Sequence, residues 1–481
     1  MIYRNEHPNP QWEREEWICL NGEWEFDFDF GRTAREREIF KDGTLSKKIN
    51  VPFCPESDLS GIGYKDFMPS VCYRREIELS VSDLEKNVIL HFGAVDFKSY
   101  IYVNGKLVTT HIGGYSSFSA DITKAVKVGT NSIFVIAEDD VRCGEQPGGK
   151  QSGRAASYEC YYTRTTGIWQ TVWLELIPKM HIKGAKYYPD AINGAVTIIG
   201  EVSGCGMLHI CAYYEDRIVG TASLEVRNTF NVCLKLDELH LWEPGHGRLY
   251  NLEFSFGEDK IKSYFGLRNV ALEGKKFTIN SQCVFQRFVL DQGFYPEGIM
   301  TAKDDNELKR DIELSMAAGF NGARLHQKVF EKRFLYYCDK AGYMVWGEHA
   351  NWGMDYTNVY AVENFMCEWM EIVDRDFNHP SIIGWCPINE TWKYYELGSK
   401  HRFIESIYNI TKKMDSTRPC IAVSGNYHIE HMEIHDIHDY CGDVQEFKES
   451  YAHIDEGIVI DQIRRAEGDI QKYKGQPIFV S

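Results

Sequence analysis

The sequence predicts a multidomain protein in which two all-β domains precede a parallel β/α barrel of the TIM type. Two observations indicate this fold class. Up to about residue 270, short runs alternate apolar and polar residues, and turn signals such as the Asn-Gly pair of "VNGK" separate them. Beyond residue 270, apolar strand-like runs alternate with stretches of helical periodicity, which is typical of a parallel sheet with helical crossovers.

The first domain is expected to span residues 1–178 and to be an all-β sandwich of the jelly-roll type. Its strand candidates include "NGEWEFDFDF", "NVILHFGAV" and "NSIFVIAED", and the run "GIWQTVWLELIP" closes the domain. A glycine-rich loop at residues 142–160 separates two of the strands. Loops of this length are often functional, so this loop is a candidate part of a binding site.

The second domain is expected at residues 179–270. Strand candidates such as "AVTIIGEVSG" and "MLHICAYYED" follow one another at a spacing that suits a small immunoglobulin-like β-sandwich. No motif within it indicates chemistry. We therefore expect a spacer that holds the other two domains in register.

The third domain, residues 271–481, is expected to be the barrel. Its strand candidates are, in order, "CVFQRFVL", "NGARL", "YMVWGE", "SIIGWCPINE", "PCIAVS", "EIHDIHDY" and "PIFVS". The first helix has Asp304 or Asp305 as its N-cap and Gly319 past its end, and a last helix is expected around "IDQIRRAEGDIQKY". A closed barrel has eight strands, so the sequence predicts a barrel truncated after the seventh.

The composition argues against several classes of partner. The chain has 53 basic and 70 acidic residues, a net charge of −17, and no basic stripe for a phosphate backbone, so nucleic acid is not expected. No stretch approaches the roughly 18 apolar residues of a membrane span, and no secretory signal opens the sequence. The 14 cysteines lack any C-x-x-C pair, which favours reduced thiols and a cytoplasmic location.

The fourth strand candidate ends in a pair of polar residues, Asn389 and Glu390. In β/α barrels the functional residues lie at the C-terminal ends of the strands. A carboxylate at that position is a candidate general acid/base, because burial and neighbouring groups can raise its pKa toward neutrality. The alternative is a glutamate that caps a helix or forms a salt bridge at a strand–loop junction.

The order of the three domains resembles glycoside hydrolase family 2, which includes β-galactosidases, β-glucuronidases and β-mannosidases. Segments of the first domain and of the barrel carry the resemblance: "YVNGKLVTTHIGGYSSFSADIT", "TRTTGIWQTVWLE", "AGFNGARLHQKVFEKRFLYYCDKAGYMVWGE", "NHPSIIGWCPINET" and "TRPCIAVSGN". The run from "NHPSII" to "NE" is highly specific. The resemblance implies that Glu390 is the acid/base and that Asn389 contacts the 2-hydroxyl of the sugar.

A retaining glycosidase needs a second carboxylate, about 5–5.5 Å from the first, which attacks the anomeric carbon. The resemblance implies that this nucleophile is a glutamate at the end of the seventh strand, after a Ser or Thr. That strand is "PIFVS", so the nucleophile is expected directly beyond Ser481. We therefore expect the chain that ends at Ser481 to be inactive.

Further positions carry over from the family to this sequence. Tyr440 resembles a tyrosine that hydrogen-bonds the nucleophile, with a rim residue as the alternative. Glu348 ends strand three, where the family often has an active-site carboxylate, and His326 is a candidate sugar contact. Many relatives have the histidine three positions after Arg324, where this chain has Gln327. Aromatic candidates for sugar stacking, with core packing as the alternative, are Trp346, Trp352, Trp385 and Trp392.

A histidine-rich segment offers a competing interpretation as a metal site. Its members are His428, His431, His435 and His438, and spacings of three and four would align them on a helix. The segment falls where strand six is expected, and a strand would point alternate residues to opposite faces. We therefore expect no metal and no organic cofactor.

Two functional hypotheses follow. The first is a retaining exo-β-glycosidase that hydrolyses O-glycosidic bonds of β-glycosides by double displacement. The second is a non-catalytic carbohydrate-binding protein whose barrel serves as a scaffold. Both have a carbohydrate as ligand, and the sequence leaves the sugar and homo-oligomerisation open.

Overall fold

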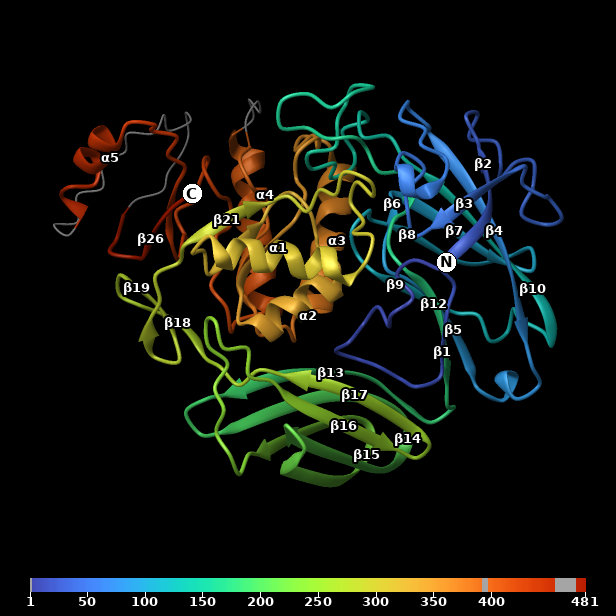
Figure 1. Cartoon of the computed structure of the whole chain (residues 1–481), viewed down its shortest axis with the longest axis horizontal. Helices are drawn as coiled ribbons and strands as arrows, with labels where there is room; N and C mark the ends of the chain where they lie inside the picture. The colour runs from blue at the N-terminus through green and yellow to red at the C-terminus, as the bar shows by residue number, and fades with distance from the viewer. Residues whose placement is uncertain (1, 392–396, 455–472) are drawn as a thin grey trace.

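The computed structural model describes residues 2–391, 397–454 and 473–481 (Figure 1). Two all-β units and one β/α unit follow one another along the chain. The first forms one side of the molecule, the second lies below, and the barrel strands with helices α1 to α4 occupy the centre (Figure 1). A multidomain chain with β domains before a β/α unit is thus what the structure shows.

The first domain is a sandwich of two antiparallel sheets. One sheet has the order β1 (Trp17–Cys19), β12 (Val172–Ile177), β5 (Asn87–Phe92), β9 (Phe118–Asp121). The other has the order β3 (Lys47–Val51), β2 (Gly22–Phe28), β4 (Ser70–Leu79), β10 (Gly129–Glu138), β7 (Lys98–Val103), β8 (Lys106–Ile112). A continuous apolar core that includes Trp24, Phe26 and Leu90 fills the space between them. Asn104 and Gly105, both with positive φ, form the predicted hairpin turn between β7 and β8.

Short elements complete this domain. They are the 3₁₀ helices η1 (Asp58–Ser60) and η2 (Asp83–Glu85) and the strand pair β6 (Val95–Asp96) and β11 (Gly167–Ile168).

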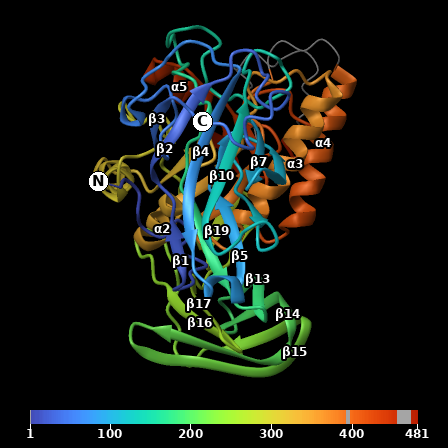
Figure 2. The same cartoon turned by 90° about the vertical axis from the view of Figure 1, so that its right-hand side faces the viewer.

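The second domain differs in detail from the predicted sandwich. Its strands, β13 (His181–Asp190), β14 (Ala195–Tyr214), β15 (Arg217–Lys235), β16 (Tyr250–Phe256) and β17 (Asp259–Phe265), form one continuous antiparallel sheet. The register of β14 against β15 shifts between Glu201 and Cys205. The first half of β14 pairs with β13 and its second half with β16, and the sheet curves beneath the molecule (Figure 2). Two long strands therefore serve both halves where an immunoglobulin-like sandwich would have two separate sheets.

The third unit contains the predicted parallel strands. A small sheet of β18 (Val270–Glu273), β19 (Lys276–Ile279) and β20 (Gln282–Cys283) precedes it. The parallel strands are β21 (Phe288–Asp291), β22 (Gly322–Leu325), β23 (Met344–Glu348) and β24 (Ile382–Cys386), with the parallel pair β25 (His435–Ile437) and β26 (Ile478–Val480). The predicted fifth strand is reduced to two parallel bridges, Trp385 with Cys420 and Asn389 with Ser424.

The helices alternate with these strands. They are α1 (Asp305–Ala317), α2 (Lys332–Ala341), α3 (Val359–Asp376), α4 (Leu397–Met414) and α5 (Val444–Ser450). The side chain of Asp304 caps α1 by accepting from the backbone of Asn306 and Glu307, and Gly319 follows the helix with φ +92°. The helix predicted at residues 460–473 lies outside the described residues up to residue 472, and Trp392 lies outside them as well. Within the described ranges, none of the helices combines the length and apolar character needed to cross a membrane.

Helix α3 fixes the first domain against the barrel. The carboxylate oxygen Oε1 of Glu368, fully buried, accepts hydrogen bonds from the backbone N–H groups of Tyr115 (2.6 Å) and Ser116 (3.2 Å). The hydroxyl of Ser116 also bonds the carboxylate of Glu371 at 2.5 Å. Because these bonds are largely shielded from water, they hold the first domain at a defined position beside the barrel strands.

Candidate functional site

Polar side chains converge where β22, β23, β24 and β25 end. The group consists of Arg324, Glu348, Asn389, Glu390 and His438. In β/α barrels the side chains at the C-terminal ends of the strands form the active-site face. Because successive residues of a strand point to opposite sides, only some of the residues at each strand end face this group. The sequence predicted four of the strand ends and placed Asn389, Glu390 and Glu348 at two of them.

Arg324 at the end of β22 is the centre of this group. Its Nε donates to Glu348 Oε2 at 2.8 Å, and its Nη1 donates to Ser424 Oγ at 2.6 Å. Its Nη2 donates to Asn389 Oδ1. The rigid, planar guanidinium thereby fixes the positions of Glu348, Ser424 and Asn389 relative to one another. An ammonium lacks this planar set of donors.

Glu348 is an ionised anchor for this network. Its side chain is fully shielded from solvent. Burial alone would raise its pKa, but the charges of Arg324 and His326 and the backbone N–H of Gln327 (2.9 Å) outweigh that effect and hold the pKa at about 2. Both oxygens are occupied, because Oε2 faces Arg324 and Oε1 faces His326 Nδ1 at 3.0 Å.

Asn389 is fixed by Asn351, which the sequence analysis did not single out. The backbone N–H of Asn389 donates to Asn351 Oδ1 at 2.9 Å, and its carbonyl accepts from Asn351 Nδ2, also at 2.9 Å. Gln327 bonds the same asparagine and accepts from its backbone N–H at 3.0 Å. The available signal was that Asn351 comes three residues after the strand end at Glu348.

Glu390 adopts a left-handed backbone conformation with φ +39°, and its side chain is 10% exposed. His438 Nδ1 lies 2.7 Å from its Oε1. His438 Nε2 lies 2.8 Å from the Ser424 hydroxyl. The Ser424 hydroxyl also donates to Asp436 Oδ2 at 3.1 Å, so Ser424 links His438 to a second carboxylate. Glu390 is thus a nearly buried carboxylate that is reachable from solvent and has His438 and Tyr440 as neighbours.

His438 was predicted only as one of four histidines of a possible metal site. Three of these imidazoles face different partners: His438 faces Glu390, His428 lies 3.9 Å from Asp436, and His435, in β25, lies edge-on to the ring of Tyr473. Across the described ranges, no group of three or more His, Cys, Asp or Glu side chains is arranged to hold a metal ion.

The remaining predicted site residues take different positions. His326 is 3% exposed, and burial lowers its pKa although Glu348 opposes this effect. Tyr440 is 85% exposed, and its ring lies edge-on to His438 with centroids 6.3 Å apart. Trp346 is 2% exposed, bonds Gln286 through its indole N–H and packs on Phe479. Stacking of a sugar on Trp346 does not agree with this burial, because its ring faces are covered by the barrel core.

The glycine-rich loop of the first domain reaches these strand ends (Figure 1). The backbone N–H groups of Gly148 and Gly149 both donate to the carbonyl of Trp352, at 2.9 and 3.0 Å. The indole N–H of Trp352 in turn donates to the carbonyl of Asn389 at 3.1 Å. The loop is thus connected through one tryptophan to the residue that precedes Glu390.

Gly149 provides a test of this docking. Its φ is +60°, and an added Cβ would lie 2.4 Å from the carbonyl oxygen of Gln327. We expect Gly149→Ala to lower the free energy of unfolding by about 1–3 kcal/mol more than a control substitution, because the loop must move away from the barrel. The control is Gly274→Ala, where φ is also +60° but no heavy atom lies within 4 Å of the added Cβ. Denaturant titrations of both variants measure the difference, and equal losses would contradict this docking.

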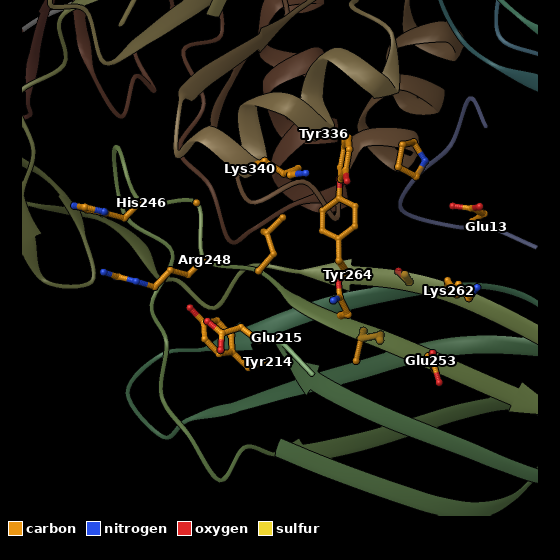
Figure 3. Close-up of a pocket in the computed structure, with 16 residues that line it drawn as sticks. Glu13, Tyr214, Glu215, His246, Arg248, Glu253, Lys262, Tyr264, Tyr336 and Lys340 are labelled. Atoms are coloured by element: carbon orange, nitrogen blue, oxygen red, sulfur yellow. The ribbon is translucent and has the colours of Figure 1, made fainter. Parts of the chain in front are cut away.

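A large cavity lies at the opposite end of the barrel (Figure 3). It has a volume of about 740 Å³ and lies between the second domain and the C-terminal end of α2, with Tyr264, Tyr336 and Lys340 in its wall. Because α2 runs back from the strand ends, its C-terminal end marks the side where the strands begin. This cavity is therefore separate from the group around Glu390.

Comparison with known proteins defines the class of this architecture. Residues 60–143 match the family described as "Glycosyl hydrolases family 2, sugar binding domain", and residues 270–479 match "Glycosyl hydrolases family 2, TIM barrel domain". The first matched segment contains strands β4 to β10 of the first-domain sandwich, and the second contains the parallel strands β21 to β25 together with Glu390. The chain belongs to glycoside hydrolase family 2.

Curated relatives carry two activity names. A "Beta-galactosidase" from Thermoanaerobacter pseudethanolicus is 26% identical over 422 residues, covering 83% of this chain and 53% of that protein. A "Putative beta-glucuronidase" from Formosa agariphila is 24% identical, covering 71% of this chain and 43% of that protein. This chain therefore spans about half the length of these two relatives.

Solved structures share the fold. An "Uncultured Clostridium sp. Beta-glucuronidase" superposes with a TM-score of 0.78 at 22% identity, covering 97% of this chain and 83% of that one. A Ruminococcus gnavus β-glucuronidase in complex with D-glucuronic acid superposes with a TM-score of 0.74 at 20% identity, covering 87% and 74%. At these identities the likeness establishes the common fold.

Proposed function

We propose that the protein is a retaining exo-β-glycosidase with Glu390 as its general acid/base. The observation that supports this most directly is the setting of Glu390. It follows Asn389 at the end of a parallel strand, is 10% exposed, and has one carboxylate oxygen held by His438 at 2.7 Å. The carboxyl group of Glu390 then protonates the glycosidic oxygen as the bond breaks.

Asn389 is proposed to bind the sugar beside the reacting carbon. Its Oδ1 accepts from Arg324, and both of its backbone polar groups bond Asn351, so its carboxamide is held in one orientation. The side-chain NH₂ remains a donor for a sugar hydroxyl. Pre-organised donors of this kind lower the barrier because they need no reorganisation when charge develops.

Glu348 is not a suitable nucleophile. Its side chain has no exposure, and its oxygens are taken by Arg324 and His326. We propose instead that the second carboxylate directly follows Ser481, as the family resemblance implies. The supporting contact is that Ser481 lies in the site, with its Oγ 3.3 Å from Arg324 Nη1 and its N–H bonded to the carbonyl of Ile437 at 2.8 Å.

Tyr440 and His326 have different proposed roles. The exposed phenol of Tyr440 lies at the rim next to His438 and interacts with Glu390, and it is proposed to orient the second carboxylate as well. His326 is proposed to bind a sugar hydroxyl through its Nε2, since its Nδ1 faces Glu348. A cytoplasmic location remains a proposal that rests on the cysteine pattern of the sequence.

Hydrolysis of aryl β-glycosides by the longest natural form of the protein tests the proposal. We expect turnover of a β-galactoside or a β-glucuronide, with the β-anomer as the first sugar product in a ¹H NMR time course, because two inversions retain configuration. An α-anomer formed first would contradict the double displacement. Sugar binding without turnover would instead support the non-catalytic carbohydrate-binding alternative.

A further inference from the structure

Lys150 brings a cation from the first domain to the barrel site. It directly follows the two glycines that bond the Trp352 carbonyl, so its backbone position is fixed by the docked loop. Its own carbonyl accepts from the N–H of Tyr162 at 2.9 Å. The residue is 5% exposed, and its Nζ lies over the ring of Trp352, 5.1 Å from the centroid.

The ammonium of Lys150 has unused donors. Among the described residues, the ammonium forms neither a hydrogen bond nor an ion pair. Its close contact is the cation–π interaction with Trp352. Burial lowers the pKa of Lys150, and Cys160, Glu348 and Glu390 oppose that effect through their charges. A lysine that is mostly buried without a hydrogen-bonded anion is costly to keep, unless a ligand supplies that anion.

The other cation of the site cannot take this role. The guanidinium of Arg324 already donates hydrogen bonds to Glu348, Asn389 and Ser424. Lys150 also has aromatic neighbours suited to a sugar, because the half-buried ring of Trp352 lies 5.7 Å from that of Tyr161. An ammonium over the ring of Trp352, within electrostatic reach of Glu390, borders the space in which a glycoside would bind.

We propose that Lys150 is a specificity-determining residue that binds a carboxylate of the substrate. The inference rests on the proposed glycosidase site, and it adds a contact from the first domain to that site. The carboxylate has two possible sources, the sugar itself or the leaving group, and both present the same anion to the ammonium. A charge-assisted hydrogen bond to that anion would satisfy donors that the protein leaves free.

Binding of S-linked glycosides separates the two sources without turnover. Phenyl 1-thio-β-D-glucuronide carries the charge on the sugar, 4-carboxyphenyl 1-thio-β-D-glucoside carries it on the leaving group, and phenyl 1-thio-β-D-glucoside carries none. The same series in the galacto configuration covers the other sugar. We expect one charged ligand to bind the longest natural form on the order of 10- to 100-fold more tightly than its neutral parent, by titration calorimetry.

Substitution then assigns the gain to Lys150. We expect Lys150→Met to remove the preference for the charged ligand and Lys150→Arg to keep most of it. Lys340→Met is the matched control, because Lys340 Nζ also lies over a ring, 5.2 Å from the Tyr336 centroid, but in the cavity at the other end of the barrel (Figure 3). It should leave the preference intact.

The outcomes separate this inference from the proposed function. No preference for either charged ligand, or a preference that survives Lys150→Met, would overturn the role of Lys150. Hydrolysis of neutral aryl glycosides in that case would leave the glycosidase proposal standing. A preference that depends on Lys150 without any hydrolysis would support the inference and contradict the glycosidase.

Discussion

Replacement of Glu390 by Gln is expected to slow hydrolysis of glycosides with basic leaving groups by about 10²–10⁴-fold, and of dinitrophenyl glycosides far less. The amide keeps the size and most of the hydrogen bond to His438 but has no acidic proton to give. A basic alkoxide needs that proton in order to leave, whereas a dinitrophenolate is stable without it. A kcat/KM series over leaving-group pKa in the longest natural form measures the difference.

Azide gives the same variant a second readout. An azide ion needs no base to deprotonate it, so it should accelerate the second step for activated substrates and yield a β-glycosyl azide. The control is Glu430→Gln, an exposed glutamate of the same domain that pairs with Lys474 at 3.3 Å. Equal losses across the leaving-group series, or an α-configured azide, would remove Glu390 from the acid/base role.

The sequence located the strand ends of the site because strand patterns are local. Apolar runs that stop at a polar residue predict where a buried strand ends, and this rule found Glu348 and Asn389. The fifth strand was overestimated, because its apolar run "PCIAVS" pairs through two bridges instead of a regular ladder. The apolar character of a run therefore predicts that the run is buried, but it does not predict whether its backbone pairs in a regular ladder.

The contacts between strands and loops could not be read in the same way. The pairing of Lys150 with Trp352 joins residues about 200 positions apart and depends on how the first domain docks. Trp346 shows the limit within one strand. It lies two residues before Glu348 and shares its face, yet it lies deeper in the barrel, against Phe479. Periodicity predicts the face of a side chain but not its depth.

Loss of Arg324 is expected to cause the largest loss of stability. The guanidinium compensates the charge of Glu348, whose side chain has no exposure, and also bonds Ser424 and Asn389. We expect Arg324→Met to lower the free energy of unfolding by about 3–5 kcal/mol at neutral pH, since it leaves a buried carboxylate without its cation. The control is Arg217→Met, which removes an exposed pair with Glu238 and should cost about 0–1 kcal/mol.

The dependence of this loss on pH distinguishes a charge effect from lost packing. The pKa of Glu348 is about 2 in the folded protein against an ordinary value of 4.5, so its ionised form stabilises the fold above pH 4.5. That contribution is lost as the pH falls from 4.5 toward 2. In Arg324→Met the buried carboxyl is expected to become neutral at a higher pH, so the difference between the two proteins should shrink in acid. A difference that stays constant from pH 7 to pH 3 in denaturant titrations would mean that Arg324 stabilises the site by packing alone.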